Sequence, residues 1–190
     1  MINKGKIFNC LLAKKILIML FVITGAVFVT ACSKDEKETT LKTVLEQMYN
    51  CPDGELIQLS KEEPKVDESK LSEGGTGIAP IQEWALLDKV DELYKPYFTE
   101  EAYQNLLNER TPYRYHLEAE ENNHTLKVNS IDMDKNKTDD SKYEFTIHIK
   151  YAPATGESKT VDIQGTAQFS EDGKINYLKF FSDIASKINE

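Results

Sequence analysis

Residues 143–151 read YEFTIHIKY, with a large apolar side chain at every second position. This alternation is typical of a β-strand that packs one face against a core and exposes the other to water. The same period occurs in residues 161–169, VDIQGTAQF, and in residues 113–119, YRYHLEA. With two further strands around residues 126–133 and 175–180, the pattern predicts an antiparallel sheet of about five strands.

Two of these strands change phase along their length. Leu126 and Val128 occupy even positions, whereas Ile131 and Met133 occupy odd ones. A slip of one residue turns every later side chain to the other face, so we predict a β-bulge near Asn129–Ser130. The same argument predicts a bend near Tyr177–Leu178. Such bulges would curve the sheet.

Helical spacing precedes the strands. It is found in residues 40–50, TLKTVLEQMYN, and again from Ile81 to Tyr94, and residues 53–62 could add a short turn. A third helix is expected after Thr99, which can serve as its N-cap. The order predicts an α+β fold over residues 40–190, in which about three N-terminal helices pack on a curved, cone-like antiparallel sheet.

The segment from 61 to 80 is charged and poor in large apolar residues, and it contains Gly74 and Gly75. It cannot bury enough apolar surface to offset the entropy lost on ordering. We therefore interpret residues 61–80 as a mobile insertion in the single α+β domain.

The N-terminal 31 residues have the three parts of a secretory signal peptide. A basic start precedes the apolar run from 16 to 29, and the small residues Thr30 and Ala31 precede Cys32. Val29-Thr30-Ala31-Cys32 resembles the lipobox of bacterial lipoproteins. That resemblance implies cleavage between Ala31 and Cys32, with acyl chains such as palmitate attached at Cys32. Residues 32–39 would then be a short tether to the cell membrane.

Charge and cysteine content limit the possible partners. The first 31 residues carry four lysines and no acid, so without them the formal charge falls from −9 to −13. An acidic domain repels nucleic-acid phosphates, which excludes nucleic acid as an expected partner. Cys10 would leave with the signal peptide and Cys32 would carry lipid, so no intrachain disulfide is expected. Cys51 is interpreted as a small packed residue.

The order of helices and strands, together with the phrase YFTEEAYQNLL at residues 97–107, resembles the nuclear transport factor 2-like, cystatin-like superfamily. Small lipoproteins of low-GC Gram-positive bacteria often carry this fold. The resemblance implies a conical cavity between helices and sheet. It also implies several functions, including ketosteroid isomerases, binding modules and subunits of conjugation channels.

Few residues suggest chemistry inside such a cavity. His116, His148 and Asp162 fall on the polar phase of their predicted strands and should face water, while His124 lies beside a turn. The aspartates at 132, 134, 139 and 140 lack the glycine and terminal glutamate of a calcium loop. We therefore expect no catalytic residue, no metal site and no cofactor.

Aromatic residues remain as candidates for a cavity lining, although periodic aromatics are more often packed as core, which is the preferred interpretation. The candidates are Trp84, Tyr94, Tyr113, Tyr115, Tyr143 and Phe145.

The leading hypothesis is a non-enzymatic binding module on the outer face of the cell membrane of a Gram-positive bacterium. It would be held there by lipid on Cys32 and would bind an envelope protein or a small apolar ligand. The alternatives are a cavity enzyme of the isomerase or dehydratase type and an accessory subunit of a conjugation or secretion channel.

Overall fold

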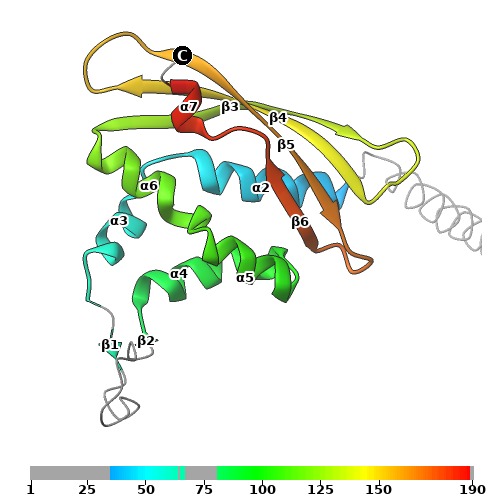
Figure 1. The fold of residues 1–190 in the computed structure, drawn as a ribbon, viewed down its shortest axis with the longest axis horizontal. Helices are drawn as coiled ribbons and strands as arrows, with labels where there is room; N and C mark the ends of the chain where they lie inside the picture. The colour runs from blue at the N-terminus through cyan, green and yellow to red at the C-terminus, as the bar shows by residue number, and fades with distance from the viewer. Residues whose placement is uncertain (1–34, 64, 67–80, 189–190) are drawn as a thin grey trace, which may run out of the picture. The chain divides into compact units, whose positions relative to one another are not determined.

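The main sheet is antiparallel and has four strands in sequence order. The computed structural model describes residues 35–63, 65–66 and 81–188 (Figure 1), so residues 1–34, with Cys32 and the predicted cleavage site, and most of the predicted insertion lie outside it. The strands are β3 (His124–Lys135), β4 (Lys142–Pro153), β5 (Lys159–Phe169) and β6 (Ile175–Phe180). The expectation of an α+β fold with an antiparallel sheet is confirmed.

Alternation in β4 and β5 places one face of the sheet in the core. Buried side chains in β4 are Tyr143, Phe145, Ile147 and Ile149, and those between them are more exposed. The predicted bulge in β3 is confirmed, because the β3–β4 register shifts between Val128 and Ser130. On β6 the register shifts between Ile175 and Tyr177, just before the predicted bend.

Gly165 in β5 marks a close approach between strands. A Cβ atom at this position would overlap the ring of Phe145 and press against the carbonyl oxygen of Lys179. Only glycine leaves room there, which keeps β6 close to β5 where Phe180 pairs with Gly165.

The main helical layer lies on one side of the sheet (Figure 1). It contains α2 (Glu36–Tyr49), α3 (Gly54–Ser60), α4 (Ala85–Tyr94), a 3₁₀ turn η2 (Lys95–Tyr97), α5 (Glu100–Asn108) and α6 (Thr111–Glu121). Thr99 caps α5 as predicted, since its Oγ1 accepts from the backbone N–H of Ala102 at 3.5 Å. Residues 36–39 of the predicted tether are helical because α2 already begins at Glu36. A short α7 (Ile184–Ile188), which we did not predict, follows β6.

Residues 113–119 form part of α6, so the prediction of a strand there is wrong. Pro112 lies in the first turn of α6, where its missing N–H costs nothing, and Arg110 just before has the left-handed φ of 58°. Tyr113, His116 and Ala119 are buried at a spacing of three, as on a helix face. In so short a window the helical period and the strand period select some of the same apolar positions.

A second correction concerns the start of α4. Residues Ile81–Glu83 form strand β2, which pairs with β1 (Lys65–Val66) in a small antiparallel sheet, and the helix begins only at Ala85. Part of the predicted insertion is therefore ordered as β1. Residues 67–80 lie outside the described residues.

The core lies between the sheet and α2, whose inward face contributes Leu41, Val44, Leu45, Met48 and Tyr49. Each of these side chains is fully buried. At about 1.5–3 kcal/mol for each large side chain, this helix contributes much of the stability of the fold. Tyr49, at the end of α2, carries this apolar face toward β6.

Candidate binding cavity

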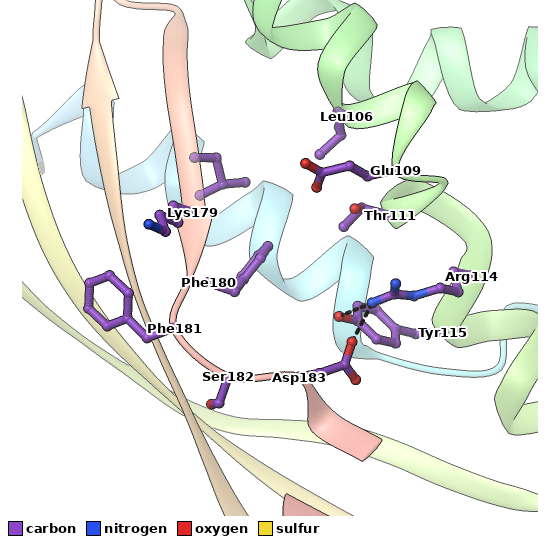
Figure 2. A pocket seen from close by; sticks show the side chains of 11 residues that line it. Leu106, Glu109, Thr111, Arg114, Tyr115, Lys179, Phe180, Phe181, Ser182 and Asp183 are labelled. Carbon is purple, nitrogen blue, oxygen red and sulfur yellow. Dashed lines mark hydrogen bonds and ion pairs between the residues drawn. The ribbon is translucent and has the colours of Figure 1, made fainter. Parts of the chain in front are cut away.

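A cavity of about 530 Å³ opens between the helical layer and the last strand (Figure 2). One wall comes from the end of α5 and the start of α6, and the other from β6 and the loop that leads to α7. The helical wall consists of Leu106, Glu109, Thr111, Arg114 and Tyr115, and the other wall of residues 178–183. A volume of this size falls within the range of small-ligand pockets.

An ion pair lies at the α7 end of the cavity. Arg114 Nη2 donates to Asp183 Oδ2 at 2.6 Å and to Tyr115 Oη at 2.8 Å (Figure 2). Glu118, one turn further along α6, places Oε1 3.8 Å from Arg114 Nε. The cation of Arg114 is therefore already balanced by carboxylates, and the guanidinium also lies over the Tyr115 ring, 4.7 Å from its centroid.

Aromatic rings form the floor behind this ion pair. Tyr49 stacks on Tyr115 with ring centroids 5.0 Å apart, and its edge meets Phe180 at 5.7 Å. The Tyr49 hydroxyl is buried, and among the described residues it has no hydrogen-bond partner of good geometry. Burial raises the pKa of Tyr49 well above its ordinary value, and burial likewise raises the pKa of Tyr115. Both phenols therefore stay protonated at neutral pH.

The six aromatic candidates lie in different places. Tyr115 lines the cavity. Tyr94, Tyr113, Tyr143 and Phe145 belong to the buried core, and Tyr94 donates to the carbonyl of Pro112 at 3.3 Å. Trp84 is half-buried at the start of α4, and its indole N–H donates to the carbonyl of Glu62 at 3.2 Å.

His116 is buried, and the expectation that it faces water is wrong. Its Nδ1 accepts from the backbone N–H of Asp53 at 2.9 Å, and its Nε2 contacts the carbonyl oxygen of Gln47 at 3.0 Å. These two bonds require a neutral ring protonated on Nε2. Burial lowers the pKa of His116, in agreement with this form. The residue ties α6 to the end of α2 and the start of α3.

His148 lies on the polar face of the sheet, as predicted. Its two ring nitrogens contact Asp132 at 3.1 Å and Asp162 at 2.7 Å, which raises the pKa of His148. His124 lies at the start of β3 beside Tyr151, and a smaller cavity of about 340 Å³ reaches it under α7. Within the described residues, no group of three or more His, Cys, Asp or Glu side chains is placed to hold a metal ion.

Cys51 is buried, as expected for a packed thiol. Its Sγ lies 3.2 Å from the carbonyl oxygen of Met48, and burial raises the pKa of the Cys51 thiol. None of the helices in the described part of the chain combines the length and the hydropathy needed to span a bilayer.

The residues that define the cavity were mostly absent from the sequence prediction. Arg114 and Asp183 are 69 positions apart, and neither stands in a motif that would pair them. Glu109 follows the end of α5 and looks like an ordinary surface acid. The scarcity of arginine was the one available signal, since only Arg110 and Arg114 are found in the chain.

No family model, curated protein sequence or solved structure matches this chain.

Proposed function

We propose that this chain is a lipoprotein anchored through Cys32 on the outer face of the cell membrane, and that its folded part binds a ligand in the β6 cavity without catalysing a reaction. The cavity between α5, α6 and β6 is the observation that carries the binding role. Its cation, Arg114, is paired with Asp183 at the α7 end of the cavity and stays protonated at neutral pH.

The arrangement of the histidines supports a non-enzymatic role. General acid–base catalysis needs a titrating group within reach of the ligand. His116 is held in the core by two bonds, His148 lies on the polar sheet face, and His124 lines the smaller cavity under α7 and not the β6 cavity. The phenols beside the cavity, Tyr49 and Tyr115, have pKa values raised by burial and remain protonated. Among the described residues, the carboxylates that line the cavity are Glu109 and Asp183, so the alternative, a cavity enzyme, would have to use one of these two groups.

The fold resemblance supports the same proposal. Helices precede a meandering antiparallel sheet and cover one of its faces, which agrees with a cone-like domain of the nuclear transport factor 2-like type. In such a cone the cavity would open at the side of β6. The role as a channel subunit stays a prediction, because it rests on no feature of the described residues.

The anchor is tested by metabolic labelling with palmitate, followed by intact-mass analysis of the membrane fraction. We expect label and cleavage after Ala31 in the native chain and neither in Cys32→Ala. Full-length protein that retains Met1 and carries no lipid would contradict the anchor.

The binding role is tested by native mass spectrometry of the acylated protein extracted from its own membranes. Leu178→Trp would fill the cavity, because Leu178 lines it. Glu144→Trp is the matched control, since it adds the same bulk on the exposed face of β4. We expect a bound species in the native chain and in the control, and its loss in Leu178→Trp. Absence of any bound species from the native chain would reject the binding role.

A further inference from the structure

The two edges of the sheet are covered to different extents. At the β3 edge, Cys51 and Leu126 exchange two backbone hydrogen bonds of 3.0 and 2.9 Å, and the N–H of Val128 donates to Asn50 Oδ1 at 2.9 Å. At the β6 edge, the N–H of Thr99 donates to the carbonyl of Ile175 at 3.0 Å. This bond belongs to a parallel bridge between Phe98 and Ile175, after which the chain turns away into α5.

The register of β6 shows which backbone groups point outward. The N–H of Phe181 donates to the carbonyl of Gln164 at 2.8 Å, and Lys179 and Tyr177 pair with Thr166 and Gln168 further along the same register. In an antiparallel ladder, alternate residues bond to the partner strand. The N–H and C=O groups of Leu178 and Phe180 therefore point away from β5, and within the described residues nothing hydrogen-bonds to them.

A groove runs along this open edge. The β6 cavity of about 530 Å³ is followed by a hollow of about 240 Å³ lined by Phe98, Ala102 and Asn105, and the two share Leu106, Glu109 and Leu178. The outward backbone groups of Leu178 and Phe180 thus border a partly apolar channel that leads from the bridge at Ile175 to Asp183. An extended chain needs both features, a free edge and room beside it.

Charge identifies the kind of chain that fits. Glu109 points into the groove and makes no ion pair within the described residues, while Arg114 is balanced by Asp183 (Figure 2). Figure 2 also shows Lys179 on the opposite side of β6 from Glu109. Lys179 and Arg114 also line the cavity, so the charge that remains on the Glu109 side of β6 is that of Glu109 itself, which is negative. A second copy of this chain would bring its own Glu109, on a domain of formal charge about −13, and would be repelled.

We propose that the β6 groove binds an extended basic segment of a partner protein, which adds to the sheet as a fifth strand beside β6. This inference rests on the proposed binding function and names the partner of the same cavity. Backbone bonds to Leu178 and Phe180 would supply affinity for any extended chain, and Glu109 would select a lysine or arginine.

The test uses the acylated full-length protein in nanodiscs and two synthetic peptides, acetyl-KVTVKVTV-amide and acetyl-EVTVEVTV-amide. Hydrogen exchange is followed residue by residue. At nine-tenths saturation with the lysine peptide, we expect the amides of Leu178 and Phe180 to exchange about tenfold more slowly, because they enter new hydrogen bonds. The amides of Tyr177 and Lys179, already bonded to β5, should not change. At the same concentration the glutamate peptide should slow the exchange of Leu178 and Phe180 less, because Glu109 repels it, and should leave Tyr177 and Lys179 unchanged.

Two variants test the charge. Glu109→Gln should weaken binding of the lysine peptide by about two- to fivefold, the range expected for an exposed ion pair. Glu144→Gln removes the same charge from the exposed face of β4 and should leave the affinity unchanged. Equal affinity in both variants and the native chain would overturn the role of Glu109.

N-methylated peptides test the added strand without changing the protein. One version of the lysine peptide is methylated on the backbone nitrogens of its valines. The other is methylated on the backbone nitrogens of its lysines and threonines, so each version blocks one edge of the extended chain. We expect one version to lose at least about tenfold in affinity while the other binds as before. Equal binding of both would overturn strand addition.

The remaining outcomes separate this inference from the proposed function. A bound native ligand, combined with no protection of Leu178 and Phe180 by either peptide, would reject the peptide partner and leave the binding role intact. If the amides of Leu178 and Phe180 exchange more slowly as the protein concentration rises, without peptide, the groove binds a second copy of the chain. This result would also reject the peptide partner. If neither a native ligand nor either peptide binds, the binding role and the peptide partner are both rejected.

Discussion

Arg114 Nη2 lies 2.6 Å from Asp183 Oδ2, and this ion pair joins α6 to the residue that begins the turn into α7. Asp183 has a second role, since its Oδ1 accepts from the backbone N–H of Ala185 at 2.9 Å. At the α7 end of the cavity, the pair therefore connects the helical wall, which contains Arg114, to the wall formed by residues 178–183. Both side chains are more than a third exposed, which limits the free energy that the pair can contribute.

Removing the charge of Asp183 should destabilise the protein only slightly. We expect Asp183→Asn to lower the free energy of unfolding by less than about 1 kcal/mol, because solvent screens the pair. Asp183→Ala should cost about 1 kcal/mol more, since it also removes the bond to Ala185. Urea denaturation of these variants, together with Arg114→Gln and the Arg114→Gln/Asp183→Asn double variant, measures the coupling. A coupling energy above about 2 kcal/mol would show that the pair is far less screened than its exposure indicates.

His116 should make stability depend on pH in one direction. Burial holds the pKa of the folded His116 below its ordinary value of 6.5. The unfolded chain therefore binds the proton more readily, so the contribution of His116 is complete above about pH 6.5 and is lost as the pH falls below it. Urea denaturation between pH 5 and 8 should show this loss in the native chain and a smaller one in His116→Gln.

His116→Ala should be among the most destabilising single substitutions in α6. It leaves the N–H of Asp53 and the carbonyl of Gln47 without their partner. Both bonds are only partly buried, so the low end of the range for an unpaired group applies, about 1–1.5 kcal/mol each, and the expected loss is about 2–3 kcal/mol. Lys127→Ala, on an exposed position of β3, is the control and should change stability little. A loss below 1 kcal/mol for His116→Ala would contradict the two bonds.

His148 should titrate in the opposite direction. Its bonds to Asp132 and Asp162 raise the pKa of His148 above 6.5, so any stability it contributes is present below that pH and is lost as the pH rises through the folded pKa. Nuclear magnetic resonance titration of the ring protons measures this pKa directly. Asp132→Asn should lower it, whereas Asp134→Asn, two residues along the same strand, should not. An equal shift in both variants would assign the effect to overall charge.

Gly165→Ala should destabilise the sheet by about 1–3 kcal/mol, because the added methyl group has no space between Phe145 and the Lys179 carbonyl. Gly54→Ala is the matched control, since a Cβ at Gly54 meets no atom within 4 Å. Thermal unfolding should show a lower melting temperature for Gly165→Ala and an equal or higher one for Gly54→Ala. An unchanged melting temperature in Gly165→Ala would mean that β6 can move away from β5.

Local sequence patterns predicted the elements whose pattern is long enough to be unambiguous. Nine residues of alternation in β4 distinguish a strand from a helix, and the change of phase in β3 located its bulge. The seven residues from 113 to 119 were too few, and Pro112 was the signal that should have favoured a helix. The misplacement of His116 followed directly from that error, since a residue on the polar face of a strand can lie on the buried face of a helix.

By itself the sequence determined the α+β class, the inward face of the sheet and the resemblance of residues 29–32 to a lipobox, because each depends on residues close together in the chain. Only the tertiary structure decided that Arg114 meets Asp183, that Tyr49 lies behind Tyr115, and that β6 keeps an open edge beside Glu109. These relationships join residues tens of positions apart. They arise from which helices and strands meet in the fold, and a local periodic pattern shows that a face is buried but not which distant residue it meets.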